Sequence, residues 1–241
     1  MNTAAQEFKR RTRRGFLTMG AGAAVAYAGW HTLRQGMAEN GLPTGFRRIL
    51  EANESIARRV TPPRSLARTF PRTEARDPRA NGGEGLASPL NPGSYRVRLE
   101  GLVTGSRELT LGEIWALPPV EMTTELMCVE GWSQVVNWTG VRVADLARTA
   151  GAARTEYVSM ATPDHGYYVG LDAESALHPQ SLLAYQMNGA PLTADHGAPL
   201  RLVIPVKYGI KNIKRVGSIR FTNQRPADYW AEQGYDWYAG L

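Results

Sequence analysis

The sequence predicts a mixed α+β fold in which strands dominate and the helices are short. Apolar and polar residues alternate over residues 95–100, which is the period of a strand with one buried face. Further strands are expected at residues 121–129, 155–161, 181–187, 200–206 and 213–222. Strand and helix signals do not alternate regularly, so a parallel sheet built from βαβ units is not indicated.

The helix and turn signals are brief. Thr110 and Glu113 form the capping-box pattern that opens a helix, and the Pro-Pro pair that follows must end it. A second short helix is expected over residues 142–150, with a glycine directly after it. Asn188 and Gly189 stand between two apolar runs and predict a β-hairpin. These signals favour mixed sheets joined by short helices.

Length and composition indicate a globular domain rather than a nucleic-acid binder. The chain has 241 residues, of which 43% are hydrophobic and 21% are charged. The net charge is +6, and residues 1–14 hold five basic side chains against one acidic side chain, which leaves +2 for the rest. So small an excess gives the folded domain no basic face, and we expect no nucleic-acid partner.

Residues 1–30 have the layout of a twin-arginine export signal. Arg13 and Arg14 precede Phe16 and Leu17, and an uncharged stretch rich in glycine and alanine runs to residue 30. This stretch is shorter than the roughly 20 residues that span a bilayer. We therefore expect a periplasmic protein, released after the Ala-Tyr-Ala at 26–28 or held at the membrane if the signal is not cleaved.

The remaining chain divides into two parts. Residues 31–94 are rich in proline and glycine, and we expect an irregular segment that wraps over the domain, with a helix around residues 45–60. Residues 95–241 carry the regular strand and helix signals and are expected to form the functional domain.

Cys128 is the single cysteine of the chain. One cysteine excludes an internal disulfide and a cysteine-rich zinc or iron–sulfur site, and the Cys-x-x-Cys-His haem attachment sequence is absent. Three interpretations stay open. The thiol is a buried hydrophobe, a nucleophile with His165 or His196 as its base, or a ligand of a soft metal.

The sequence around Cys128 resembles a known family. Cys-Val-Glu-Gly-Trp-Ser at 128–133 and Asn-Trp-Thr-Gly-Val at 137–141 are similar to the core motif of the sulfite oxidase superfamily. The chain is most similar to the bacterial branch that includes the catalytic subunit of the periplasmic methionine sulfoxide reductase. Further similar blocks follow in order at 182–192, 195–201, 205–214 and 225–237.

The resemblance implies a sulfite-oxidase-like, molybdopterin-binding fold and an oxidoreductase. The sulfur of Cys128 would bind molybdenum beside the dithiolene of one molybdopterin, and the reaction would be oxygen-atom transfer at an oxo-molybdenum centre. The expected substrate is an S- or N-oxide of the methionine sulfoxide type. The alternatives are a dehydrogenase for sulfite or another small sulfur compound, and a non-catalytic binding subunit that kept the fold.

The resemblance also implies which residues hold the cofactor. Positions that match pterin-phosphate contacts are Arg201, a bidentate donor, and His196. Further matched contacts are Thr162, Asn212, Ile213 and Lys214, with a weaker match at Asn81-Gly82.

The catalytic side chain near the metal is expected to be Tyr167, with His165 and Tyr168 as alternatives. One departure from the family bears on the substrate. Glu130-Gly131-Trp132-Ser133 stands where animal and plant sulfite oxidases carry Asn-Arg-Arg, and Met127 replaces an arginine found in many bacterial relatives. An anionic substrate needs adjacent cations, so their absence weakens the prediction of sulfite.

Electron transfer requires a second protein. The sequence carries neither a haem attachment motif nor a cluster motif, so a separate redox partner is expected, and the family suggests a membrane cytochrome b.

Overall fold

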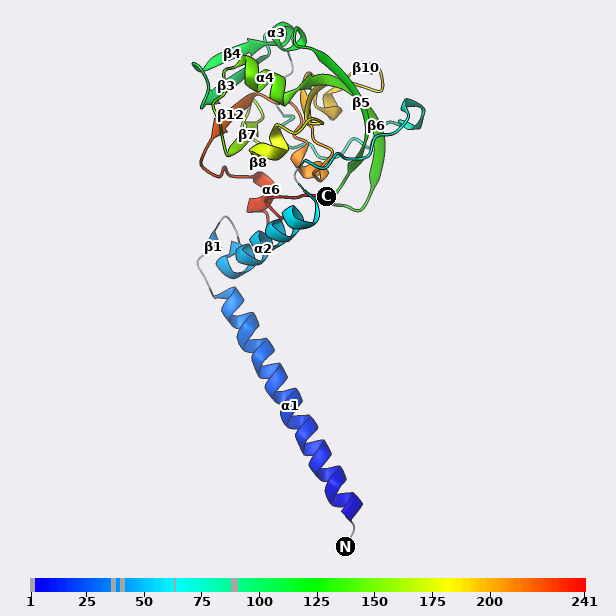
Figure 1. Cartoon of the computed structure of the whole chain (residues 1–241), viewed down its shortest axis with the longest axis vertical. Coiled ribbons are helices and arrows are strands. Elements are labelled where there is room, and N and C mark those ends of the chain that lie inside the picture. The colour runs from blue at the N-terminus through cyan, green and yellow to red at the C-terminus, as the bar shows by residue number, and fades with distance from the viewer. Residues whose placement is uncertain (1–2, 36–37, 40–41, 63, 88–90) are drawn as a thin grey trace.

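A computed structural model describes residues 3–35, 38–39, 42–62, 64–87 and 91–241. It shows a body of two sheets, from which the helix α1 (Thr3–Arg34) projects (Figure 1). The short strands β1 (Ala38–Glu39) and β2 (Leu42–Pro43) lead to the helix α2 (Thr44–Val60), which lies between α1 and the body. In the described part of the chain, no helix combines the length and the apolar character that crossing a membrane requires.

The first sheet has five strands in the order β4-β3-β12-β7-β8. Its pairs are antiparallel except for β12 against β3, which is parallel. The strands are β3 (Arg96–Gly101), β4 (Arg107–Thr110), β7 (Tyr157–Ala161), β8 (Tyr168–Asp172) and β12 (Ser218–Thr222).

The second sheet follows the order β10-β9-β6-β5, with β11 paired to β9, and is antiparallel throughout. Its strands are β5 (Pro119–Met127), β6 (Ser133–Arg142), β9 (Leu182–Met187), β10 (Ala190–Pro191) and β11 (Arg201–Val203). Short helices join the strands, as the mixed α+β prediction requires: α3 (Leu111–Trp115), α4 (Val143–Thr149), α5 (Ala173–Ala176) and α6 (Tyr229–Glu232).

Several local predictions are confirmed. Thr110 and Glu113 form the reciprocal hydrogen bonds of a capping box at the start of α3. The Asn188-Gly189 pair forms the β9–β10 hairpin turn, with both residues at positive φ. The helix expected near 45–60 is α2.

Three strand predictions need correction, and five strands were missed. The strand expected over 121–129 ends at Met127, so Cys128 lies in the turn that follows. The strand expected over 213–222 is β12 alone. Residues 209–211 form a 3-10 helix, and residues 212–217 form an irregular loop that hydrogen-bonds to Leu200 and Leu202. The strand expected over 200–206 is the shorter β11. The strands that were not predicted from the sequence are β1, β2, β4, β6 and β8.

The main core lies between the sheets. Val97 and Leu99 of β3 and Phe221 of β12 come from one sheet, whereas Val141 of β6 and Leu183 of β9 come from the other. All five are buried and belong to one hydrophobic cluster. Burial of large apolar side chains is the dominant favourable term in folding, so this cluster fixes how the two sheets face each other.

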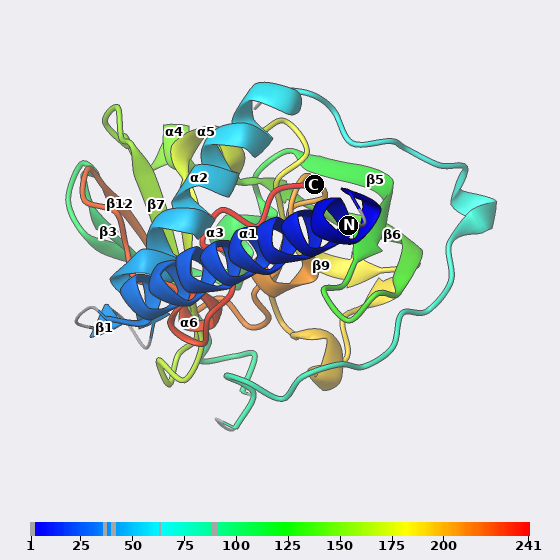
Figure 2. The ribbon, with the colours of Figure 1, turned by 90° about the horizontal axis from the view of Figure 1, so that it is seen from below.

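Residues 64–87 cross the outside of the second sheet (Figure 2). Phe70 donates its backbone N–H to Thr123 of β5, and Arg76 donates to Val135 of β6. The side chain of Gln180 bonds both backbone groups of Ala67. These bonds bring the segment to the Cys128 end of the sheet. The predicted boundaries at residues 30 and 94 remain predictions, because parts of both preceding segments lie outside the described residues.

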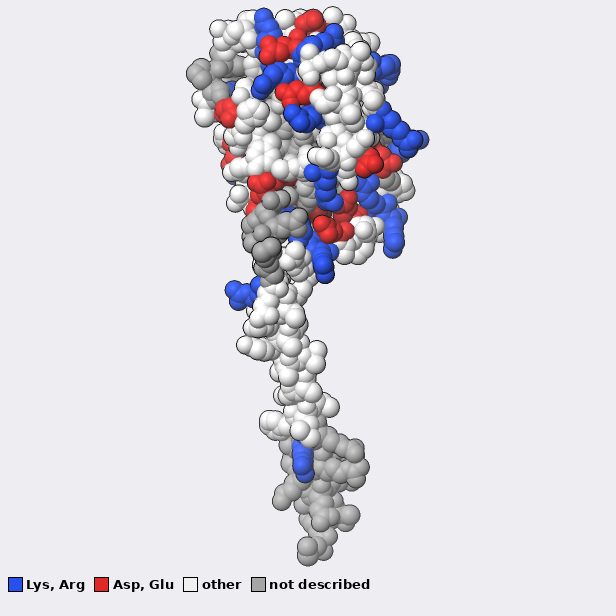
Figure 3. All heavy atoms as spheres, turned by 90° about the vertical axis from the view of Figure 1, so that its left-hand side faces the viewer, with Lys and Arg blue, Asp and Glu red and all other residues white. Residues whose placement is uncertain are grey.

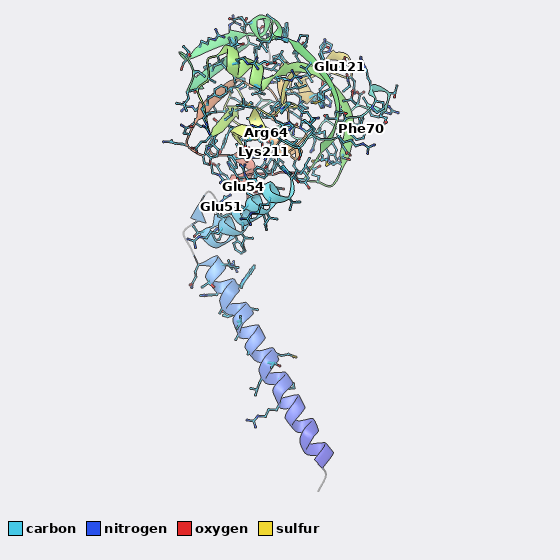
Figure 4. All side chains as sticks on the ribbon, viewed as in Figure 1. Glu51, Glu54, Arg64, Phe70, Glu121 and Lys211 are labelled. Carbon is cyan, nitrogen blue, oxygen red and sulfur yellow. The ribbon has the colours of Figure 1, made fainter. Side chains whose placement is uncertain are left out.

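Two buried lysines anchor the loop that follows β11. The Lys211 ammonium lies 2.5 Å from the Asp228 carboxylate and donates to the Gly170 carbonyl. Lys207 lies 3.4 Å from the Asp172 carboxylate and 2.9 Å from the ring centre of Tyr238. Figure 4 shows Lys211 inside the body. Burial lowers the pKa of both lysines, that of Lys207 to about 7, because the low-polarity interior disfavours the charged form.

Removal of one partner from the Lys211–Asp228 pair is expected to be costly. Lys211→Met leaves the Asp228 carboxylate buried and uncompensated, which costs about 3–5 kcal/mol of unfolding free energy. The double variant Lys211→Met/Asp228→Asn removes both charges and should recover much of that loss. Urea unfolding measures both values. Equal stability of the single variant and the parent would contradict the assignment of this pair as an anchor.

A candidate cofactor cavity around Cys128

Cys128 sits in a tight turn between β5 and β6. Its backbone N–H donates to the Trp132 carbonyl, and its own carbonyl accepts from Gly131. Gly131 has a φ of 86°, a left-handed conformation that glycine adopts without strain. The turn holds the thiol half-buried at the edge of a cavity, where the Asn81 side-chain amide lies 3.7 Å from Sγ.

The cavity has a volume of about 890 Å³, part of which is open to solvent. Segments that are far apart in sequence meet there: the wrapping segment near residue 80, the Cys128 turn, the loop after β11 and the C-terminal run. Six of the predicted site residues line it, namely Cys128, Tyr167, His196, Arg201, Asn212 and Lys214. The weaker match at Asn81-Gly82 lines it as well.

Arg201 is a buried cation without a carboxylate partner among the described residues. The residue is 4% exposed, and its guanidinium donates to the carbonyls of His196 (3.1 Å) and Asn212 (3.3 Å). The ring of Trp138 lies 4.9 Å from it, and Nε makes no hydrogen bond in the structure. Burial lowers the pKa of Arg201 to about 10, so it is charged at neutral pH.

Lys214 supplies a second cation to the same cavity. Its ammonium donates to the backbone carbonyls of Asn81 and Gly82, and no carboxylate in the described ranges reaches ion-pair distance. Burial, together with the nearby Arg201 charge, lowers the pKa of Lys214 to about 8. Two partly desolvated cations that repel each other indicate a site for an anion.

These residues fit molybdopterin. A phosphate has the negative charge that Arg201 and Lys214 lack among their protein partners, and the free Nε of Arg201 offers it a further donor. At the edge of the same cavity, the Cys128 thiol supplies the soft sulfur that molybdenum favours. The two requirements of the cofactor, an anion site and a thiolate, thus occur within one cavity.

His196 and Asn212 line the cavity while their side chains already have protein partners. The His196 ring contacts the hydroxyl of Thr193 (2.8 Å) and the carbonyl of Pro78 (3.2 Å). The Asn212 amide accepts from Ile204 and donates to Tyr208. Both side chains hydrogen-bond to other segments of the cavity wall, and their contacts with the phosphate stay predictions.

Thr162 and Ile213 do not line the cavity. The Thr162 hydroxyl forms hydrogen bonds with the Asp164 carboxylate and with the backbone N–H and carbonyl of Tyr167. It therefore holds the backbone at the start of β8. Ile213 is a core residue, and its carbonyl accepts from Leu202. Both side chains are buried in the protein, and the contacts of these two positions with the cofactor stay predictions.

Of the three candidates for the catalytic side chain, Tyr167 alone faces the cavity. Its hydroxyl donates to the Ile210 carbonyl, and burial raises the pKa of the phenol, so the group keeps its proton. Tyr168 points elsewhere and donates to Glu232. His165 is exposed, and its ring lies 3.3 Å from the Arg98 guanidinium.

The outer cavity contains residues that the sequence analysis did not assign to the site. Arg79 lies 5.8 Å from the centre of the Trp132 ring, whose N–H donates to Glu130. Trp230 and Tyr235 form another part of the lining, with ring centres 5.3 Å apart. The signal for the last two was the C-terminal run 225–237, which resembled the family without indicating any role.

Comparison with known proteins identifies the class. Residues 85–230 match the family model described as the oxidoreductase molybdopterin binding domain. The chain therefore belongs to the molybdopterin-binding oxidoreductases, and molybdopterin is its cofactor.

The chain is also similar to named bacterial proteins of this class. It is 36% identical over 182 residues to an Azospira oryzae protein provisionally named a protein-methionine-sulfoxide reductase subunit, which covers 74% of this chain and 69% of that protein. It is 33% identical to a Ralstonia nicotianae protein-methionine-sulfoxide reductase catalytic subunit, over 64% of this chain and 53% of that protein. The chain thus spans about half the length of that catalytic subunit.

A solved structure shows the same fold. The sulfane dehydrogenase SoxCD of Paracoccus pantotrophus matches with a TM-score of 0.55 and 22% identity, over 68% of this chain and 46% of that chain. The sulfite-oxidase-like fold predicted from the sequence is confirmed.

Loss of the Arg201 guanidinium should weaken cofactor retention. Hydrogen bonds to a charged group contribute about 1.5–3 kcal/mol, so Arg201→Ala should lower affinity for the pterin about tenfold to a hundredfold. Pterin content after acid release measures the effect. Arg220→Ala, which removes an exposed arginine paired with Glu100, is the matched control. Equal pterin in both variants would contradict the phosphate role.

Proposed function

We propose that this enzyme reduces a neutral S-oxide of the methionine sulfoxide class by oxygen-atom transfer. The observation that carries the proposal is the mixed lining of the cavity. The buried Arg201 and the half-buried Lys214 suit the cofactor phosphate, whereas Val129, Glu130 and Trp132, which follow Cys128 in the chain, are apolar, acidic and aromatic.

The outer lining favours a neutral sulfur compound over an anion. Trp132, Trp230 and Tyr235 offer aromatic rings, which attract sulfur in thioethers and related groups. The Glu130 carboxylate, held by the indole of Trp132, repels an anion such as sulfite. Arg79 is the observation in favour of the second candidate, a dehydrogenase for a small anionic sulfur compound, because it brings a cation to the same rim.

The residues of the chain would bind the cofactor and orient the substrate, while the bound molybdenum cofactor would supply the chemistry of oxygen-atom transfer. Cys128 would hold the metal through Sγ. Tyr167 keeps its proton on the phenol oxygen, and this O–H donates to the Ile210 carbonyl in the structure. To donate to an oxygen of the substrate, the O–H would have to turn away from that carbonyl. The aromatic rim would exclude water and hold the apolar part of the substrate.

The partner and the location are part of the proposal. The sequence carries no haem or cluster motif, so electrons would come from a separate redox protein, for which a membrane cytochrome b fits an exported enzyme. Relatives named as subunits support a separate partner. The Arg13-Arg14 pair before Phe16 and Leu17 supports export through the twin-arginine route.

Cys128→Ser should abolish turnover while the fold and most of the pterin remain, because a hydroxyl replaces a thiol of similar shape. The sulfur coordination of molybdenum, measured by X-ray absorption, should fall by one. The parent should reduce methionine sulfoxide with a chemical electron donor and should not oxidise sulfite. Sulfite oxidation without sulfoxide reduction would reverse the choice between the two candidates, and a cofactor-loaded parent without either activity would favour the non-catalytic alternative.

Export can be tested without changing the charge of the N-terminus. Arg13→Lys/Arg14→Lys keeps both positive charges, so a merely basic tail would still function. A twin-arginine signal requires the guanidinium pair, and the double variant should therefore accumulate in the cytoplasm. Normal periplasmic accumulation, measured by fractionation, would rule out the signal.

A further inference from the structure

We propose that the exposed face of α2 docks onto a bilayer surface that contains anionic phospholipid. The inference goes beyond the proposed function and does not depend on it.

The helix α2 has two distinct faces. On one face, Ala57 packs against the cluster of Ala231, Trp237 and Tyr238 in the body. On the other face, Ile49, Ile56 and Val60 are exposed, the last two by 57% and 75%. Their spacing of seven and four residues places them in one stripe along the helix. Large apolar side chains grouped in this way mark an interaction surface.

The charges beside the stripe are mainly positive. Arg48 and Arg59 are exposed on the same side of the helix, and Glu51, on α2 in Figure 4, is the acidic residue exposed among them. Arg58 points inward, where it pairs with Glu54 and lies 3.7 Å from Asp172. An apolar stripe flanked by arginines is the composition of a helix that lies in the interface of an anionic membrane.

The exposed side chains of the neighbouring helix α1 favour lipid over a protein as the partner of α2. Trp30 of α1 meets Phe46 of α2 with ring centres 5.9 Å apart, so the two helices adjoin. The described length of α1 is largely uncharged in Figure 3. It exposes the apolar side chains of Phe16, Leu17, Met19, Val25, Tyr27 and Trp30. A bilayer that takes up these side chains also meets α2.

The inward face of α2, opposite the docking face, adjoins the cavity wall. Arg47 on this inward face donates to the Ala231 carbonyl in α6 at 3.0 Å, and the adjacent Trp230 lines the cavity. Membrane docking through the outward face would therefore leave α2 between the bilayer and the Trp230 side of the cavity.

The test uses the full chain with an environment-sensitive fluorophore at chosen positions. In the Cys128→Ser background, single labels are attached after Ile56→Cys, after Ser55→Cys and after Glu108→Cys. Positions 55 and 56 differ by one residue but lie about 100° apart around the helix. Position 108 lies in β4, at the far end of the body from α2 (Figure 1). Vesicles of phosphatidylcholine with and without phosphatidylglycerol are the probes.

The label at position 56 should move to shorter emission wavelength on the vesicles with phosphatidylglycerol, and the labels at 55 and 108 should change much less. Arg48→Gln/Arg59→Gln should lower partitioning roughly tenfold to thirtyfold, and added salt should weaken it. Sedimentation with vesicles while the label at 56 is silent would mean that α1 binds alone, which overturns the proposal. An equal response of all three labels, or no binding to either vesicle, also overturns it. None of these results depends on turnover.

Discussion

The buried Lys211–Asp228 pair is the constraint on which the site depends. Asp228 receives the Lys211 ammonium, the Gly170 amide of β8 and the Ala231 amide of α6 on its two oxygens. One carboxylate therefore ties three elements together: the loop after β11, a strand of the first sheet and the C-terminal run. Lysines are rarely buried so deeply without a partner. The attraction between the two charges offsets the free energy that desolvation of either one would cost. The loop it holds packs against the Cys128 turn, where a side chain added at Gly209 would lie 3.3 Å from the Met127 carbonyl.

A second feature, the separation of charges by depth, explains how one cavity can serve both a cofactor and a substrate. Lys207 and Lys211 are neutralised by carboxylates behind the wall and contribute little to the cavity. Arg201 and Lys214 face the cavity and have backbone carbonyls as partners, which leave their charges uncompensated and the Arg201 Nε unpaired. Glu130 and Trp132, which follow Cys128 in the chain, line the same cavity. The cations attract an anionic phosphate, whereas the carboxylate of Glu130 disfavours a second anion beside Cys128.

The sequence predicted the elements whose signals are local. The capping box at Thr110, the hairpin at Asn188-Gly189 and the alternating strand at 95–100 each depend on neighbours within a few residues. Among the strands that it missed, β6 and β8 are almost entirely buried or half-buried and lack clean alternation of apolar and polar residues. Of the site, the resemblance predicted the cysteine and the cations. It could not predict that Thr162 and Ile213 turn into the protein, because side-chain direction depends on tertiary contacts rather than on position in a motif.

The C-terminal run shows why the outer cavity escaped prediction. Residues 229–238 supply Trp230 to the cavity, place Tyr238 between Lys207 and Arg58, and bring Trp237 to within 4.9 Å of Lys211. Each contact joins the run to a different part of the chain, and no pattern within the run encodes them. The C-terminal run contacts both α2 and the cavity, so α2 and the outer lining of the cavity belong to one packed unit. A displacement of α2 would therefore act on the C-terminal run through several direct contacts, which include the Arg47–Ala231 hydrogen bond, the Ala57 contact and the stacking of Arg58 on Tyr238.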